Sequence, residues 1–419
     1  MVPPLASAPP GRARPAGDTW ESAQRPPPRR FEPDLVRVVA LLLVVVIHAT
    51  PWPQRAGAAG PFYSGLALWS RSSVPLFVVL SGVLLAPSSE RRVNGAAFWG
   101  RRLSRTLLPW IPWAVLYFAV EVVFRGLPPS PQGNWDWWAG GAGHLYFLLL
   151  IPQLYCLLLI WPRSERGRTV ALAIAIAVQL ALQLVRVLIR LPPPGNDLTL
   201  NFGFELAPFW VGYFALGIWA GPRLRRLSGG LSAWTVCLGA MVAASALLFW
   251  APLGPVARDW GPWVRGTGAF LRPALLPLTA SLTALLWLGG RRLADSAVWL
   301  RTAVASAGRH ALGIYIVHPL ALLALGTVLQ RLGGPLALEQ GLPGSLLPFA
   351  LLVAFALAVG WAATHFLASF RYSAWTVGEA AEHRPGAPAA PHPLCPGPQP
   401  EPVSGVSAPA QPARSAGSI

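Results

Sequence analysis

The chain has 419 residues, of which 54% are hydrophobic and only 12% are charged. So few charged side chains could not cover the surface of an ordinary soluble enzyme, and so many apolar ones exclude a chain that is disordered throughout. The net charge of +17 comes from arginine alone, because there is no lysine, and the arginines lie in short clusters between long apolar runs, which argues for a polytopic membrane protein and against nucleic-acid binding.

The two ends of the chain differ from its middle. Residues 1–30 are rich in proline and arginine, so we expect a disordered N-terminal tail, and they lack the apolar core of a cleavable signal peptide. Residues 373–419 return to proline, alanine and glycine, which predicts a second disordered tail. The transmembrane domain is therefore expected to occupy residues 31–372.

Ten apolar stretches within this domain are long enough, or nearly so, to cross ~30 Å of hydrocarbon with ~20 residues each. We therefore predict an all-α fold, a membrane helix bundle of about ten transmembrane helices. Proline inside several stretches does not weaken the prediction, because membrane helices tolerate it. The stretches lie near 35–52, 65–86, 107–124, 145–162, 169–190, 204–221, 232–252, 269–290, 311–328 and 346–368.

The arginines predict the orientation of the bundle. With ten helices, the segments on the N-terminal side of the membrane hold 23 arginines, whereas the loops on the other side hold five. Positive charge concentrates in cytoplasmic segments, so we expect both termini in the cytosol.

The first apolar stretch carries the strongest candidates for chemistry, because ionisable residues inside a membrane are unfavourable and therefore functional by default. Arg37 and His48 are eleven residues apart, so on a helix they share a face, with His48 ~16 Å further along the axis. Asp34 precedes Arg37 by one turn and can pair with it. We predict a catalytic set of His48 as general base with Arg37 and Asp34. The alternative is a charged pair that anchors the helix end and a histidine that only packs.

A basic cluster follows the second apolar stretch. Arg101, Arg102 and Arg105 would share one face of a helix on the cytosolic side. Guanidinium groups bind phosphates with paired hydrogen bonds, so we expect this cluster to bind a phosphorylated ligand, with plain positive-inside charge as the alternative. Ser81 and Gly82, near the inner end of the second stretch, are assigned to the same ligand site or, equally, to close helix packing.

Three further residues are candidates for an acceptor site or second site. His318 lies in the ninth stretch, and Pro319 after it frees a backbone carbonyl one turn back. Tyr315 lies in the same segment, and His144 opens the fourth stretch at the outer face. The alternative for both histidines is an ordinary packing or interfacial role.

Five motifs in chain order resemble the acyltransferase-3 family of membrane O-acyltransferases. Each is short, but their order across residues 31–320 makes the resemblance specific. Tyr146 and Val78 stand where the family usually has Trp and Phe, and both changes are conservative. The motifs are Asp34-Leu-Val-Arg37 with His48 after ten apolar residues, Val74-Pro-Leu-Phe with Ser81-Gly82, Arg101-Arg102 with Arg105, His144-Leu-Tyr146-Phe147-Leu, and Gly308 to Pro319 (GRHALGIYIVHP).

The resemblance implies an enzyme of the plasma membrane that uses acyl-CoA, with acetyl-CoA expected, as donor substrate. It also implies that acyl-CoA is the ligand of the site assigned to Arg101, Arg102, Arg105, Ser81 and Gly82. It implies no bound cofactor and no metal. The acceptor would be a hydroxyl group of a cell-surface glycan or of a glycosylated small molecule. Some relatives carry a fused extracytoplasmic domain, and we identify none in this sequence, so we expect direct transfer or the help of a separate extracytoplasmic transferase. The lipid bilayer is the other expected partner, and nucleic acid is not one.

Other functions fit the sequence less well. A polytopic transporter is the main alternative, since many helices around a midplane site would suit it, but no paired and similarly interrupted helices occur in the two halves. An inactive scaffold is a third reading, and the intact Asp34, Arg37 and His48 argue against it. The sequence has no Gly-x-Ser-x-Gly elbow and no lysine-containing phosphate loop. Its three cysteines, Cys156, Cys237 and Cys395, predict neither a disulfide framework nor a zinc site.

Overall fold

The computed structural model describes residues 30–55, 61–90, 96–125, 143–188, 206–227, 229–250, 272–331, 342–370 and 372–378. Within these ranges the chain is helical and contains no β-strand, which confirms the predicted all-α fold. The long helices are α1 (Phe31–Ala49), α4 (Ser73–Glu90), α5 (Ala96–Arg125), α7 (Tyr146–Tyr155), α9 (Glu165–Leu188), α11 (Val211–Arg226), α12 (Leu231–Trp250), α15 (Leu275–Leu293), α16 (Val298–Arg309), α17 (Ala311–Arg331) and α18 (Leu342–Ala368).

Short helical segments connect or flank these helices. They are α2 (Pro51–Arg55), α3 (Pro61–Ser70), η1 (Gly143–Leu145), α8 (Leu157–Ile160), η2 (Ala207–Phe209) and α19 (Ser373–Thr376). Residues 1–29 of the predicted N-terminal tail and the predicted C-terminal tail after Gly378 lie outside the described residues. The prediction of a disordered tail is wrong for the first residues after 372, which form α19. α19 packs on α5, where the Trp113 indole donates a hydrogen bond of 2.6 Å to the Thr376 carbonyl.

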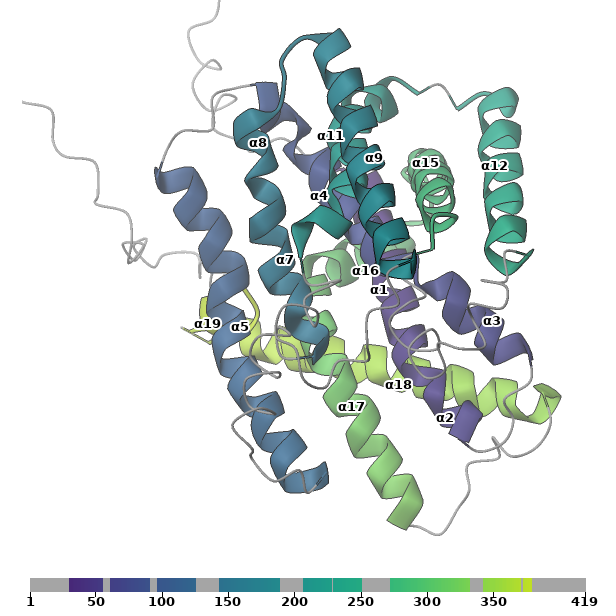
Figure 1. Ribbon diagram of the computed structural model, residues 1–419. Coiled ribbons are helices and arrows are strands. Elements are labelled where there is room, and N and C mark those ends of the chain that lie inside the picture. The colour runs from purple at the N-terminus through teal and green to yellow at the C-terminus, as the bar shows by residue number, and fades with distance from the viewer. Residues whose placement is uncertain are drawn as a thin grey trace, which may run out of the picture.

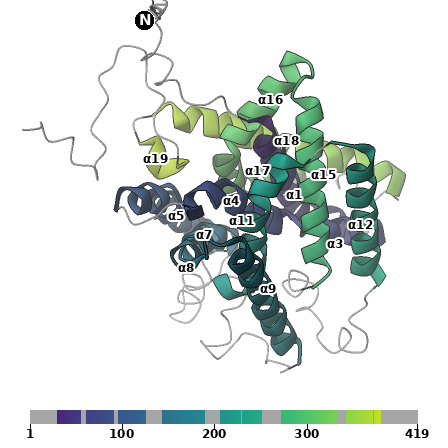
Figure 2. The same cartoon turned by 90° about the horizontal axis from the view of Figure 1, so that it is seen from above.

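The bundle is arranged around α1. Several long helices, among them α5, α7, α9 and α12, run in a similar direction, and α18 crosses them (Figure 1). Seen from above, α1, α4 and α11 lie near the middle, with α5, α9 and α12 further out (Figure 2). α1 contacts α4, α15, α16, α17 and α18, so its side chains can reach sites that several helices share.

Eight described segments are long and apolar enough to cross a bilayer. The two other predicted spans, near 204–221 and 269–290, correspond to α11 and α15. These two helices do not meet the same requirement of length and apolar character, because α11 has only 16 residues and α15 carries Arg291 and Arg292 near its end. The eight segments are Phe31–Pro53, Phe62–Pro87, Phe98–Val123, Gly143–Ile160, Glu165–Val185, Leu231–Phe249, Ala311–Val328 and Gly344–Ala368.

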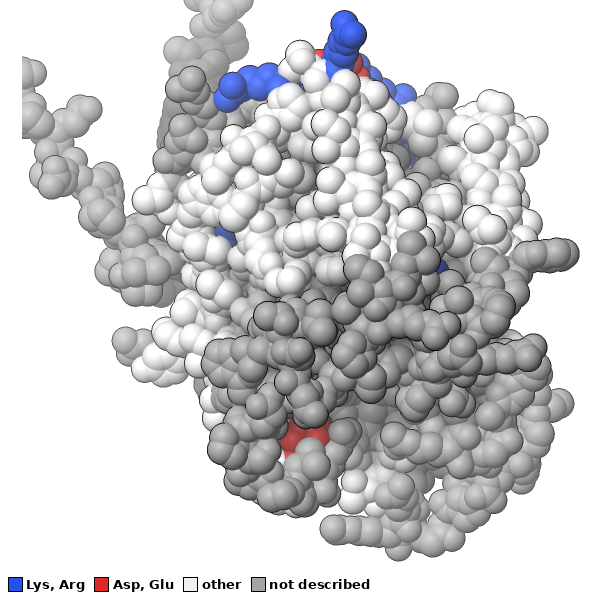
Figure 3. Space-filling view, viewed as in Figure 1, with Lys and Arg blue, Asp and Glu red and all other residues white. Residues whose placement is uncertain are grey.

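The outer surface of the bundle is apolar. Val123, Ile160 and Val236 are each at least 70% exposed, which would be unfavourable in water and is expected against lipid. Charged side chains are sparse along the flank of the described helices and gather at the end where α9 begins (Figure 3). Exposed charged residues near this end include Arg163 and Arg166, close to the start of α9, and Arg226, the last residue of α11. This distribution matches the separation of apolar spans from arginine clusters in the sequence.

The backbones of α4 and α11 approach each other closely. A Cβ atom at Gly82 would lie 2.3 Å from the Phe214 carbonyl oxygen, and one at Gly217 would lie 2.1 Å from the Val79 carbonyl oxygen. Only glycine allows the two backbones to come this close. Gly82 therefore has the packing role that the sequence offered as one of two alternatives.

Candidate active site

Three histidine rings from different parts of the chain meet inside the bundle. His48 comes from α1, His144 from η1 and His318 from α17. The ring centroids of His48 and His318 are 5.0 Å apart, those of His144 and His318 are 5.8 Å apart, and those of His48 and His144 are 6.0 Å apart. We call these residues the histidine cluster.

The protonation pattern of His318 follows from its neighbour in the sequence. Pro319 has no N–H to bond the Tyr315 carbonyl four residues earlier. His318 Nδ1 lies 2.7 Å from that carbonyl oxygen, and because a carbonyl oxygen only accepts hydrogen bonds, Nδ1 carries the proton. The neutral ring then has its lone pair on Nε2, which is buried and has no hydrogen-bond partner in the described part of the chain.

Two tyrosines hold this part of the site together. The Tyr117 hydroxyl of α5 donates a hydrogen bond of 2.6 Å to the Ile316 carbonyl, and its ring lies 4.6 Å from that of His144. The Tyr315 hydroxyl donates a hydrogen bond to the His144 carbonyl. Tyr117 therefore links α5 to α17, and Tyr315 links α17 to η1, beside the histidine cluster. Nothing in the sequence indicated a role for Tyr117.

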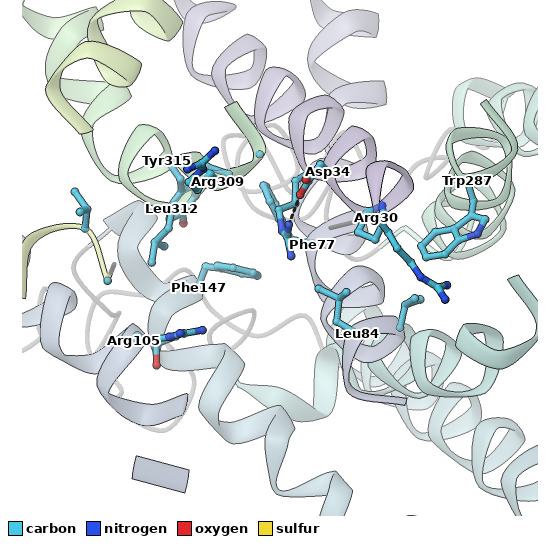
Figure 4. Close-up of a pocket in the computed structure, with 18 of the residues that line it drawn as sticks. Arg30, Asp34, Phe77, Leu84, Arg105, Phe147, Trp287, Arg309, Leu312 and Tyr315 are labelled. Atoms are coloured by element: carbon cyan, nitrogen blue, oxygen red, sulfur yellow. Dashed lines mark hydrogen bonds and ion pairs between the residues drawn. The ribbon is translucent and has the colours of Figure 1, made fainter. Parts of the chain in front are cut away.

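A cavity of about 1150 Å³ lies on the other side of Tyr315. Five arginines line it together with a single carboxylate, so its walls are strongly positive. Figure 4 shows Arg30, Arg105 and Arg309 reaching it from different sides. We call it the arginine cavity; its charged lining residues are Arg30, Asp34, Arg37, Arg105, Arg225 and Arg309.

The predicted pair of Asp34 and Arg37 forms part of the cavity wall. Arg37 Nη1 donates a hydrogen bond of 2.6 Å to Asp34 Oδ1, and Asp34 is only 1% exposed. Gly308 of α16 lies against the carboxylate, where a Cβ atom would come within 2.9–3.0 Å of the Asp34 side chain. The carboxylate is thus fixed between its own helix and α16.

Three aromatic rings connect the arginine cavity to the histidine cluster. Phe77, Phe147 and Tyr315 all line the cavity, and the Phe147 ring lies 5.8 Å from each of the other two. The Tyr315 ring is also 5.7 Å from His144 and 6.1 Å from His318. We call these rings the aromatic layer. The three histidines are not part of the described cavity lining, so the layer lies between the two regions.

The predicted basic motif is divided by the structure. Arg101, Arg102 and Arg105 lie within α5, which begins at Ala96, well before the predicted apolar stretch at 107–124. The helix continues because it need not end where the hydrocarbon layer ends. Arg105 lines the cavity, Arg101 is exposed, and the Arg102 guanidinium lies over the Phe98 ring at 5.5 Å.

The predicted acyl-CoA residues Ser81 and Gly82 are also outside the described cavity lining. The Ser81 hydroxyl donates a hydrogen bond of 2.8 Å to the Phe77 carbonyl, within its own helix. Their assignment to a ligand site stays a prediction.

Three lining arginines received no individual role from the sequence. Arg30 precedes α1, Arg225 lies on α11, and Arg309 lies on α16. In the sequence they counted only toward the positive charge of cytosolic segments, and no spacing rule connects positions so far apart. In the described part of the chain, no group of three or more histidine, cysteine or acidic side chains has the arrangement of a metal site.

A comparison with known protein families gives one match. A family model described as an acyltransferase domain matches residues 30–365, which is most of the chain. No curated protein and no solved structure gives a significant match.

Proposed function

The chain belongs to the acyltransferase-3 family, and on this premise we propose that it transfers an acyl group from acyl-CoA to a hydroxyl group. Family membership and the long apolar helices make it a multi-pass membrane acyltransferase. The observation that supports acyl-CoA as the donor is the arginine cavity, a large and positively charged space. Tyr315 lines this cavity and also contacts the histidine cluster.

Acyl-CoA suits the arginine cavity by charge and by size. Coenzyme A carries three phosphates, and guanidinium groups bind phosphate with short, charge-assisted hydrogen bonds. The cavity slightly exceeds the ~300–1,000 Å³ of most small-molecule sites. We assign the phosphates to Arg105, Arg225 and Arg309. Arg101 and Arg102 would attract the same polyanion toward the cavity from the cytosol.

We assign Arg37 to holding the donor and not to the reacting atoms. It lines the cavity, whereas His48 lies eleven residues later on α1, ~16 Å further along the helix. Asp34 would act through Arg37, because its buried carboxylate fixes the guanidinium at 2.6 Å. Asp34 is thus proposed as a positioning residue.

His48 is proposed as the general base. Its imidazole removes the proton from the acceptor hydroxyl, and the oxygen attacks the thioester carbonyl carbon. The carbon–sulfur bond then breaks, and the proton passes to the departing thiolate. The products are free coenzyme A and an O-acyl ester. The thioester would approach His48 through the aromatic layer, since Tyr315 contacts both the cavity and the cluster.

The acyl group and the acceptor are proposed from the family resemblance. We expect an acetyl group, and a hydroxyl on a cell-surface glycan or on a glycosylated small molecule, with the enzyme in the plasma membrane. His144, beside His48, is proposed to border the acceptor. A separate extracytoplasmic transferase stays a candidate partner.

The test is transfer of labelled acetyl from acetyl-CoA to a cell-envelope extract by the purified protein in liposomes. The wild type should form a base-labile labelled ester. His48→Ala should lower the rate by about 10²–10⁴-fold, the usual contribution of a general base. Binding of coenzyme A should persist in this variant, because His48 is outside the cavity lining.

His365→Ala is the matched control, since His365 stacks on Trp361 and is not part of the histidine cluster. Its rate should stay near that of the wild type. Folded wild-type protein that neither binds coenzyme A nor forms the ester would overturn the proposal.

A further inference from the structure

A histidine that acts as a general base in a dry site needs a partner for its second ring nitrogen. When one nitrogen takes a proton from the substrate, the other carries an N–H, and a hydrogen-bond acceptor fixes the ring and its tautomer. In many enzymes this acceptor is a carboxylate. The following inference rests on the proposed role of His48 and identifies its acceptor.

The neighbours of His48 leave few choices. In the described part of the chain it interacts with Arg71, His144 and His318, and none of these is a carboxylate. The Arg71 guanidinium has only donor groups, so it cannot accept the N–H. Among the described side chains that interact with His48, the two other histidines are the ones that can accept this N–H.

His318 has a free lone pair in a fixed position. Its Nδ1 proton is held by the Tyr315 carbonyl at 2.7 Å, so its Nε2 can only accept in the neutral ring. His318 is fully buried, and Nε2 has no hydrogen-bond partner among the described residues. Such a buried, unsatisfied acceptor is unfavourable unless a donor reaches it.

Within the described part of the chain the structure has no hydrogen bond at His318 Nε2, but the His48 ring is close enough for a small rotation to form one. A ring nitrogen lies about 1.2 Å from its centroid, so an N–H···N bond of about 2.9 Å places two imidazole centroids about 5 Å apart. The centroids of His48 and His318 are 5.0 Å apart with the ring planes at 58°, whereas His144 is a full ångström further from His48.

We propose that His318 is a positioning residue that accepts the N–H of His48 and so directs the other nitrogen of His48 toward the acceptor hydroxyl. The bonds form a chain from the Tyr315 carbonyl through His318 to His48. His318 thus takes the place that a carboxylate has in other general-base sites. Pro319 contributes to this hydrogen-bonded arrangement, because its missing N–H leaves the Tyr315 carbonyl available to His318.

Two substitutions at one position separate this role from simple packing. In His318→Gln, the side-chain carbonyl can stand where Nε2 stood and accept from His48. In His318→Asn, the amide reaches only the position of Nδ1. We expect His318→Asn to lower kcat by about 10–100-fold, as for other groups that orient a functional histidine. His318→Gln should recover most of this loss.

The KM for acetyl-CoA should be unchanged in both variants, because His318 does not line the arginine cavity. Equal losses in the Asn and Gln variants, or wild-type kcat in both, would overturn the inference. So would a rise in the KM for the acceptor at constant kcat, which would make His318 a binding group.

The same pair of substitutions at His144 completes the test. A loss of kcat that only glutamine rescues, found at His144 and not at His318, would give the orienting role to His144 and overturn our assignment. Failure of the general proposal looks different, because then the wild type itself transfers no acetyl group.

Discussion

The arginine cavity and the histidine cluster lie on opposite sides of one tyrosine and follow different physical rules. The cavity is lined by five arginines from several parts of the chain, and their combined positive charge attracts a polyanion. In the cluster His318 is fully buried and His48 and His144 are partly buried, and the rings lie within 6.0 Å of one another. The His318 ring is held by the Tyr315 carbonyl.

This difference decides how each region should respond to substitution. Electrostatic attraction falls slowly with distance, so a group of arginines can lose one member and still bind. A general base depends on the placement of single atoms, and small displacements there greatly reduce the rate. Changes in the cavity should therefore alter KM for the donor, whereas changes in the cluster should alter kcat.

The largest of three further effects is expected from Arg105→Ala in the cavity. Hydrogen bonds to charged groups contribute about 1.5–3 kcal/mol, so the KM for acetyl-CoA should rise by roughly 10–100-fold while kcat is kept. Steady-state kinetics over acetyl-CoA concentration measure both constants. Arg101→Ala is the matched control, because Arg101 is one helical turn away and exposed like Arg105 but outside the cavity lining, and it should change KM far less. Equal effects of the two substitutions would mean that the basic motif acts as a whole.

Gly308→Ala should disturb the cavity wall without touching the cluster. The added methyl group would lie 2.9–3.0 Å from the Asp34 side chain and displace the carboxylate from Arg37. Such overpacking typically lowers stability by about 1–3 kcal/mol. Thermal unfolding in detergent and the KM for acetyl-CoA measure the result, with kcat largely kept.

Gly239→Ala on α12 controls for the added methyl group, because nothing lies within 4 Å of a Cβ atom there. Unchanged stability and KM in Gly308→Ala would show that the Asp34 carboxylate has room to move.

The smallest effect is expected from Pro319→Ala in the cluster. The new N–H at residue 319 would compete with His318 for the Tyr315 carbonyl and loosen the orientation of the ring. One hydrogen bond contributes about 0.5–1.5 kcal/mol, so kcat should fall by roughly 2–10-fold with the KM for acetyl-CoA unchanged.

Pro348→Ala, at another proline inside a helix, is the control for helix straightening in general. Wild-type turnover in Pro319→Ala would mean that His318 keeps its tautomer without the freed carbonyl.

The sequence by itself determined the features that depend on local pattern. Apolar stretches of ~20 residues predict membrane helices because the bilayer sets their length, and the described helices follow the predicted order. Asp34 and Arg37 pair because they are one turn apart on one helix. Pro319 indicated a freed carbonyl, because the missing N–H is a property of the residue itself.

Only the tertiary structure decided which faces of these helices meet. His48, His144 and His318 are far apart in the sequence, and each alone is compatible with a packing role. Arg105 lines the cavity and Arg101 and Arg102 do not, because Arg105 lies about one turn further along α5. Arg225 and Arg309 join Arg105 from other helices. The hydrophobicity of a helix face does not indicate which other helix it will contact. That contact depends on how two whole surfaces pack together, as the close approach of Gly82 and Gly217 shows.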